Sequence, residues 1–392
     1  MIYLITFGIS CGLFVLSESK YLKKKKCLKV IFAVLAITVP SLLAGLRDSS
    51  VGTDVEVYGN FWFEYTQRMK FLRYIEFAKS CSIGVVYALL NYIVGLFTDD
   101  TKIYYFVLSF VETGLIYIGV KMFNGLDRKS LFNNKLVLND NNKISLPFAM
   151  FCYYTIFYNN TLNLLRQFLA VCFVFVAYMF IMKKKYVVSV LILMVAFLSH
   201  NSALFSFLLI PIFIISNEKL KSREKVYIFN IILFCSISLV MILYKPVLIL
   251  FISKGILSSR FLTYMEGTVV GGRMIRTVFW VILAVLGYIA FPKMINYQKE
   301  SKFIISCITT SFAFSFVMFM GNVYAIRMAF YFDLASLIFI PMIPKIYKLD
   351  YKGIRLKYGM YVFLIIVLIA RWYLEYVRSN NGQTFPYKFI QF

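Results

Sequence analysis

The stretch Ala44–Tyr58 concentrates charged and hydroxylated side chains directly after an apolar segment. It carries Arg47, Asp48 and Asp54, and two of its glycines permit tight turns and close approach of a ligand to the backbone. An arginine beside carboxylates at the end of an apolar helix suggests a site for an anionic, hydroxylated ligand. The alternative is a solvated loop in which the arginine and the carboxylates pair with one another.

A second group of polar side chains lies where a later apolar segment begins. Asn163, Arg166 and Gln167 are spaced three and four residues apart, so we expect them to share one face of a helix. Polar groups that enter an apolar helix are costly and usually functional. These residues are therefore candidates for the same site.

The only histidine, His200, precedes Asn201 within an apolar stretch, residues 186–215, that lysine clusters bound on both sides. One helix of that length would measure about 45 Å, too long for a single upright span. We therefore expect two short helices that fold back at His200. The imidazole then either caps or packs at this turn, or takes part directly in catalysis.

Two more arginine groups and an aromatic tail complete the candidate residues. Arg273 and Arg276 follow a pair of glycines at a predicted helix start, and helix N-termini favour phosphate. Arg327 also opens a predicted helix, with Tyr331 following. The tail that contains Tyr387 is expected either to fold over the site or to lie at the membrane interface.

The composition is that of a multi-spanning membrane protein. Hydrophobic residues make up 61% of the 392 residues and charged residues 15%, and the mean hydropathy is +0.77. The first apolar run, 2–16, is interpreted as a retained helix and not a cleaved signal peptide. One histidine and seven scattered cysteines argue against a metal centre, and we predict neither a metal nor a cofactor.

The net charge of +24 comes mainly from lysine clusters between the apolar runs, which is the pattern of cytoplasmic loops and not of nucleic-acid binding. With these clusters inside, both termini lie outside. The chain is then an all-α polytopic membrane protein, a single domain over 1–392 with about 12 transmembrane helices. The predicted spans are 2–16, 28–46, 103–123, 145–159, 161–182, 186–200, 201–215, 226–244, 277–291, 303–320, 324–343 and 357–377.

Two larger outer loops follow from this topology, at 47–100 and 245–276. The first contains mixed aromatic and charged residues that fit short amphipathic helices on the membrane surface. Its apolar segment Cys81–Phe97 is interpreted as re-entrant or as lying on the outer surface.

The predicted outer side carries ten of the thirteen arginines, whereas lysine dominates the inner side. The planar guanidinium is preferred where phosphate or carboxylate must be held by two hydrogen bonds. An anion-binding outer surface is therefore expected. The alternative, arginines that extend to the lipid headgroups, is assigned to Arg371 and Arg378.

Several blocks, taken in order along nearly the whole chain, resemble the EpsG-type family of polysaccharide polymerases, which is related to Wzy. They are Arg47-Asp48 with Val51-Gly52-Thr53-Asp54 and Tyr58, then Leu165–Ala170, Ser199–Leu204, Arg327 with Tyr331-Phe332, and Pro386-Tyr387. The resemblance implies a GT-C-like membrane glycosyltransferase in the bacterial inner membrane, with its site facing the periplasm or cell exterior. It would join oligosaccharide units carried on undecaprenyl pyrophosphate, with lipid-linked donor and acceptor, membrane lipids and a possible chain-length regulator as partners.

On this hypothesis the candidate residues take three roles. The expected pyrophosphate ligands are Arg47, Arg166, Arg273, Arg276 and Arg327. The candidate catalytic residues, which would accept the acceptor hydroxyl's proton, are Asp48, Asp54 and His200. The expected substrate contacts are Tyr58, Gln167, Asn201, Tyr331 and Tyr387.

Two other functions stay open at this point. A transporter or flippase of lipid-linked sugars would be expected to show internal repeats and a midplane site, and neither is evident in the sequence. A membrane O-acyltransferase would also use a single important histidine. Loss of acylation with normal chain length in a His200→Ala variant would indicate that third function.

Overall fold

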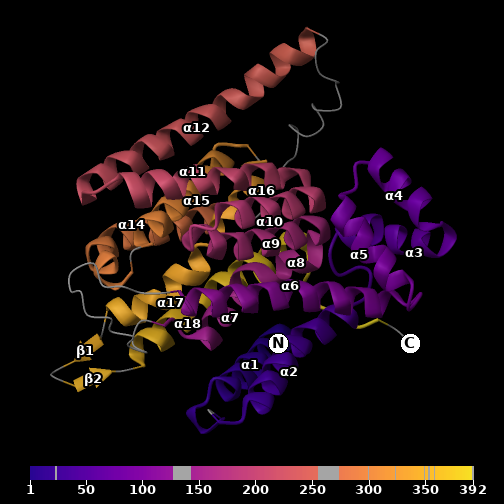
Figure 1. Cartoon of the computed structure of the whole chain (residues 1–392), viewed down its shortest axis with the longest axis horizontal. Helices are drawn as coiled ribbons and strands as arrows, with labels where there is room; N and C mark the ends of the chain where they lie inside the picture. Colours follow the sequence, from indigo (N-terminus) through magenta and orange to yellow (C-terminus); the bar gives the residue numbers. More distant parts are fainter. Residues whose placement is uncertain are drawn as a thin grey trace. The chain divides into compact units, whose positions relative to one another are not determined.

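The computed structural model describes residues 1–22, 24–126, 143–254, 273–298, 300–322, 324–347, 349–351, 354–356 and 358–390, which are largely helical (Figure 1). They form two compact units, each described here by itself. Unit 1 comprises residues 1–126, 143–204 and 365–392, and unit 2 comprises 127–142 and 205–364. The chain passes between the units within η5 (Asn201–Leu208) and within α18 (Gly359–Trp372).

The long helices confirm an all-α polytopic membrane protein. Among the described residues, eight helices are long and apolar enough to cross a membrane, or nine if the pair α16 (Ala325–Asp333) and α17 (Ser336–Ile346), bent by 47°, forms one span. The sequence predicted about 12 because it included segments of roughly 15 residues, below the usual spanning length. Two of these, α1 (Ile2–Ser17) and α10 (Tyr186–Ser199), form shorter apolar helices.

Unit 1 is built on six helices whose apolar side chains pack together while their backbone groups bond within each helix, as a membrane requires. Besides α1 and α10, they are α2 (Lys26–Gly45), α6 (Thr101–Asn124), α7 (Leu146–Tyr153) and α9 (Leu165–Met182). Shorter turns are η1 (Lys20–Leu22), η4 (Tyr154–Tyr158), α8 (Asn159–Asn163), η7 (Tyr373–Arg378) and η8 (Asn381–Gln383). α1 and α2 lie side by side (Figure 1), and α6 packs against both α2 and α9.

The two ends of this bundle carry different basic residues, lysines at one end and Arg47 at the other. At one end, Lys121 Nζ lies 3.8 Å from Glu18 Oε1, and the side chain of Asn124 makes two hydrogen bonds to the backbone of Ile144. These contacts join the ends of α1 and α6 to the start of α7, all in segments flanked by lysine clusters. At the other end α2 finishes at Gly45 against the start of α6, and Arg47 follows.

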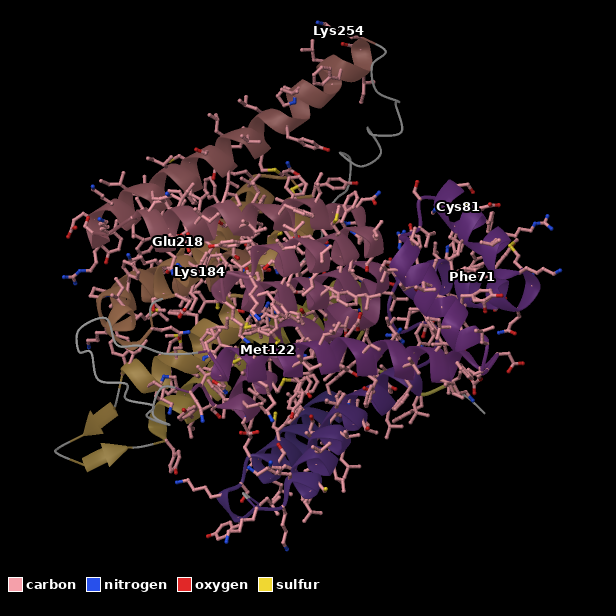
Figure 2. The ribbon with its side chains drawn as sticks, viewed as in Figure 1. Phe71, Cys81, Met122, Lys184, Glu218 and Lys254 are labelled. Carbon is pink, nitrogen blue, oxygen red and sulfur yellow. The ribbon has the colours of Figure 1, made fainter. Side chains whose placement is uncertain are left out.

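Residues 55–95 form short helices around an aromatic core: η2 (Val55–Asn60), α3 (Phe61–Arg68), α4 (Phe71–Ser80) and α5 (Val85–Gly95). Tyr74 donates to the Trp62 carbonyl at 3.0 Å, and Tyr104 donates to the Tyr87 hydroxyl at 2.6 Å. Figure 2 labels Phe71 and Cys81 at the two ends of α4. The helix α5 is about 16 Å long, half the hydrocarbon thickness, which agrees with a segment that does not cross.

Unit 2 contains α11 (Leu209–Phe213), η6 (Ile214–Lys219), α12 (Arg223–Ser253), α14 (Arg273–Tyr297), α15 (Ser301–Phe319), α16, α17 and a hairpin of β1 (Leu349–Tyr351) with β2 (Ile354–Leu356). Ser306 Oγ donates to Asn230 Oδ1 at 2.7 Å and thereby joins α15 to α12. The helix α12 extends past residue 244, the predicted end of its span, to Ser253, just before Lys254 (Figure 2). Residues 255–272 of predicted outer loop 2 lie outside the described residues, and 273–276 belong to α14.

Two glycines of α6 provide a matched test of the packing. A Cβ on Gly119 would lie 2.4 Å from a ring carbon of buried Phe175 on α9, whereas a Cβ on Gly114 would meet nothing within 4 Å. We expect Gly119→Ala to destabilise unit 1 by about 1–3 kcal/mol through overpacking. Gly114→Ala should be neutral or stabilising, since alanine favours helix. Thermal unfolding of both variants in detergent checks this, and equal midpoints would contradict the α6–α9 packing.

Candidate functional site

Arg47 is buried at the end of α2, with 3% of its surface exposed. Its Nη1 donates to the Leu162 carbonyl at 2.8 Å, and its guanidinium lies 4.4 Å from the centre of the Tyr105 ring. Leu162 lies at the end of α8, where Leu164 takes a non-helical conformation, so its carbonyl lacks the usual helical donor. Arg47 supplies that donor.

Gly52 brings the loop after Arg47 onto the same helix break. Its φ of +106° is a conformation that side chains rarely adopt, and a Cβ there would lie 2.7 Å from the Leu162 carbonyl oxygen. Its amide donates to the Gln383 carbonyl at 3.1 Å. Only glycine therefore fits at this position of the stretch.

The C-terminal tail pairs with the same stretch. The Asp48 amide donates to the Lys388 carbonyl at 2.9 Å, and the Ile390 amide donates to the Leu46 carbonyl at 3.0 Å. The Tyr387 hydroxyl donates to the Leu43 carbonyl at 2.6 Å. The tail thus folds over the Arg47 stretch, as one of the two sequence-based alternatives expected.

Asn163 and Arg166 do not share one helical face, so that prediction is wrong. Leu164 breaks the helix between them, because α8 ends at Asn163 and α9 begins at Leu165. Asn163 Oδ1 instead accepts two hydrogen bonds of 2.7 Å, from the amide and the hydroxyl of Thr53. Gln167, the third residue of the group, is buried within α9.

Arg166 is half-buried and faces the short helices of unit 1. Its guanidinium lies 3.7 Å from the centre of the Tyr58 ring, and its Nη1 donates a long hydrogen bond of 3.4 Å to the Ser82 carbonyl. Stacking on an aromatic face orients the planar guanidinium while part of it stays accessible. Of the predicted arginines in unit 1, Arg166 is therefore better placed than Arg47 to meet a ligand.

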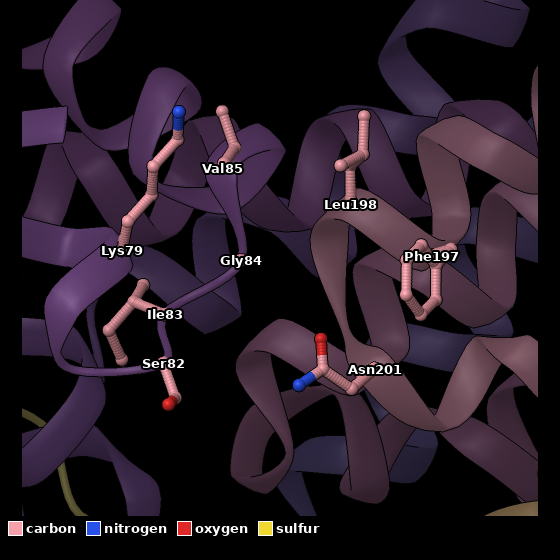
Figure 3. Close-up of a pocket in the computed structure, with 8 residues that line it drawn as sticks. All are labelled: Lys79, Ser82, Ile83, Gly84, Val85, Phe197, Leu198 and Asn201. Atoms are coloured by element: carbon pink, nitrogen blue, oxygen red, sulfur yellow. The ribbon is translucent and has the colours of Figure 1, made fainter. Parts of the chain in front are cut away.

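Beside Ser82 lies a hollow of about 230 Å³ (Figure 3). The turn from α4 to α5 lines one side and the end of α10 lines the other, with Lys79, Ser82 and Asn201 as its polar side chains. The two sides approach closely at Gly84, where a Cβ would lie 2.0 Å from the Ser199 carbonyl oxygen. The hollow is smaller than the ~300–1,000 Å³ of most ligand pockets, so it has room for only part of a large ligand.

His200 lies where the sequence predicted the break. The helix α10 ends at Ser199, His200 is extended, and a second helical stretch begins at Asn201. His200 Nδ1 lies 2.7 Å from Ser202 Oγ and accepts from the Ser202 amide at 3.3 Å. This geometry supports the capping alternative, and a catalytic role stays a prediction.

Asp48 and Asp54 lie on the Arg47 loop, and both are partly buried. Asp48 Oδ1 accepts from the Ser50 hydroxyl at 2.6 Å and from the Ser50 amide at 3.0 Å. These hydrogen bonds hold the pKa of the Asp48 carboxyl below its ordinary value. Asp48 is thus ionised at neutral pH, but it is a weaker base than an unperturbed aspartate.

The remaining predicted residues belong to unit 2. Arg276 is buried, pairs with buried Asp333 and lies 5.0 Å from the centre of the Phe330 ring, so an internal carboxylate already engages its charge. Arg327 is exposed near Tyr324, and Tyr331 is fully buried. The side chain of Arg273 lies outside the described residues.

The structure also shows polar residues that the sequence analysis did not select. Asn159 Oδ1 accepts from Trp372 Nε1 at 2.7 Å, and its Nδ2 donates to Thr384 Oγ1 at 2.9 Å. Arg371 does not extend to lipid headgroups as expected; it is buried, pairs with Glu375 and donates to the Thr155 carbonyl. The available signal was the spacing of Arg371 and Glu375, four residues apart on one helix.

The fold and this polar bundle end define a polytopic helical membrane protein in which side chains distant in sequence meet where the helices end. A family model, the EpsG family, matches residues 30–389, and the chain belongs to that family. The EpsG family is a Wzy-like polymerase family, which associates the chain with polysaccharide biosynthesis. Comparisons with curated proteins and with solved structures give no match.

Arg47→Lys tests the structural role of the buried guanidinium. Lysine keeps the charge but cannot both reach the Leu162 carbonyl and stack on Tyr105. We expect a loss of about 1–3 kcal/mol in the free energy of unfolding, measured by thermal unfolding in detergent. Arg68→Lys is the control, because the contacts of Arg68 with Glu64 and the Tyr65 ring are exposed and the substitution should change stability little.

Proposed function

We propose that the protein is a polysaccharide polymerase, a membrane glycosyltransferase that joins lipid-linked oligosaccharide units at the outer face of the bacterial inner membrane. The observation that carries this proposal is membership of the EpsG family over residues 30–389. The end of unit 1 that carries the arginines supports it, since the protein must bind the anionic pyrophosphate group next to the lipid that carries it.

The orientation follows from the charge difference between the two ends of unit 1. The end that contains Lys121 and the residues before α2 is rich in lysine, which favours the cytoplasmic side. The opposite end, with Arg47 and Arg166, then faces the periplasm or the cell exterior. A polymerase working there would meet repeat units that have already crossed the membrane.

In the proposed reaction the acceptor hydroxyl attacks the anomeric carbon of the donor chain. A new carbon–oxygen bond forms, the bond from that carbon to the pyrophosphate oxygen breaks, and lipid pyrophosphate leaves with the electron pair. Cationic groups stabilise the charge that develops on the leaving group. Arg166 is the residue of unit 1 that we assign to this role, and Arg47 positions the loop around it.

The proposed pyrophosphate ligands still include Arg273, Arg276 and Arg327. The pairing of Arg276 with Asp333 favours a structural role for Arg276. Asp48, Asp54 and His200 remain the proposed acceptors of the hydroxyl proton. Asp48 is a weaker base than an unperturbed aspartate, because Ser50 stabilises its ionised form.

The hollow beside Ser82 supplies proposed sugar and phosphate contacts. Lys79 and Asn201 offer hydrogen-bond donors in the hollow. The stacked pair of Tyr58 and Arg166 offers an aromatic ring and a guanidinium nearby. Gln167, Tyr331 and Tyr387 complete the proposed substrate contacts. Of these, Tyr387 already uses its hydroxyl to donate to the Leu43 carbonyl, so we propose that a sugar would stack on its ring.

Arg166→Lys separates a bidentate anion site from a merely basic surface. Lysine keeps the charge but loses the paired donors of the planar guanidinium. We therefore expect the amount of long polymer to fall at least tenfold, while the protein level and the unfolding midpoint stay close to wild type. A polymer ladder with parallel measurement of protein in membranes checks this, with Arg68→Lys as the matched control. Single repeat units should still appear outside the membrane. Accumulation of single units on the inner face would instead indicate a transporter.

Ser50→Ala tests whether ionised Asp48 takes part in the reaction. Without the Ser50 hydroxyl the pKa of Asp48 rises toward its ordinary value, so the carboxyl becomes protonated at a higher pH. The acidic limb of the pH–activity profile should therefore move upward, with activity near neutral pH retained. An unmoved acidic limb would show that Asp48 is not the titrating group.

A further inference from the structure

Glu112 lies near the middle of α6 and is the only acidic residue in that membrane-length helix. It is 1% exposed, and neither carboxyl oxygen makes a hydrogen bond to any residue that the structure describes. A carboxylate left bare in an apolar interior would be very costly. Intramembrane acids therefore mark functional sites in most cases.

Two hydroxyl side chains share the same face of α6. Ser109 lies three residues before Glu112 and four before Thr113, so its side chain is a neighbour of both on the helix surface. Both hydroxyls are buried; within the described part of the chain Ser109 makes no hydrogen bond, and Thr113 bonds no carbonyl of its own helix. In unit 1, by contrast, the helical residues Ser41, Thr155, Ser189 and Ser199 each bond the carbonyl four residues before them.

A third hydroxyl reaches the cluster from a neighbouring helix. Tyr153 belongs to α7, which packs on α6, and its buried hydroxyl lies close enough to interact with Thr113 and Glu112. The other ionisable groups within electrostatic reach of Glu112 are Arg47 and the Cys172 thiol of α9. Four buried oxygen-bearing side chains therefore lie at neighbouring positions of α6 and α7, and the Glu112 carboxyl oxygens have no hydrogen-bond donor among the described residues.

We propose that Glu112, Ser109, Thr113 and Tyr153 form an intramembrane binding site for a small monovalent cation, either a proton held on the carboxyl or a sodium ion held among the oxygens. Hydroxyl and carboxylate oxygens suit a hard cation. One carboxylate balances one positive charge, and the nearby Arg47 guanidinium disfavours a divalent ion. The bound cation removes the cost of a bare charge in the bundle.

This site goes beyond the proposed polymerase activity. Its occupancy affects the end of unit 1 that contains Arg47. Arg47 donates to the Leu162 carbonyl and lies within electrostatic reach of Glu112. Loss of the cation would leave an ionised Glu112 that competes for Arg47. The cation therefore stabilises the arrangement of the Arg47 loop.

The test uses the purified full-length protein in detergent and compares wild type with Glu112→Gln, a neutral isostere. Glu64→Gln is the control, because Glu64 is exposed on α3. Thermal unfolding is followed against sodium chloride, with choline chloride keeping the ionic strength constant. Infrared spectroscopy measures the carbonyl stretch of protonated carboxyl groups in the absence of sodium.

A wild-type unfolding midpoint that rises with the logarithm of sodium concentration, and a flat response in Glu112→Gln, identifies sodium as the occupant. A protonated-carboxyl band present in wild type and absent in Glu112→Gln, without a sodium response, identifies a proton. If wild type shows neither, Glu112 is ionised without a cation and the proposal is wrong.

Should Glu112→Gln not fold, Ser109→Ala with Thr113→Val keeps the acid and removes two of the proposed oxygens. The double variant should lose the sodium response, or shift the carboxyl band to higher frequency if a proton is bound. An unchanged response and an unchanged band would overturn the site.

Discussion

The hydrogen bond from the Arg47 guanidinium to the Leu162 carbonyl is the interaction on which the polar end of unit 1 depends. A helix broken within an apolar bundle leaves carbonyls without donors, and an unpaired backbone group there costs free energy. Arg47 removes that cost from a segment more than a hundred residues away. Because Gly52 and the C-terminal tail pack on the same break, one buried cation organises three distant parts of the chain.

The arginines of this protein have different environments and therefore different capacities. Arg47 is enclosed, Arg166 is stacked but still accessible, and Arg276 and Arg371 are paired with internal carboxylates. A guanidinium whose charge an internal carboxylate already balances has less to offer an incoming anion. Among the arginines of unit 1 selected from the sequence, this leaves Arg166, beside a hollow with Lys79 and Asn201, as the strongest candidate for the proposed pyrophosphate contact.

Most polar groups discussed from the interior of unit 1 also have partners that offset the cost of burying them. Tyr3, Tyr158 and Asn159 are buried, and each of their polar ends has a partner elsewhere in the bundle. Such pairing ties helices together where hydrophobic packing alone gives little directional preference. Glu112 is different because its carboxyl oxygens lack a described partner, which is why it points to a bound cation and not to a structural contact.

The sequence by itself determined the membrane class, the place of nearly every helix and the family. These depend on local composition: apolar runs of spanning length, lysine clusters between them and short motif blocks that each lie within a few residues. It also located the breaks near Gly45 and at His200. The single membrane domain of 1–392 and the sidedness stay predictions.

Only the tertiary structure decided which polar residues meet, because those contacts join segments far apart in sequence. Spacing placed Asn163 and Arg166 on one face, but the break at Leu164 separates them; Arg47 bonds the Leu162 carbonyl beside this break, and Thr53 bonds the Asn163 side chain. The spacing of Arg371 and Glu375 permits their pairing but could not show that the pair is buried, and spacing could not show that Glu112 stays unpaired. Burial and pairing are properties of the packed bundle, where each polar group is costly until a distant neighbour supplies its partner.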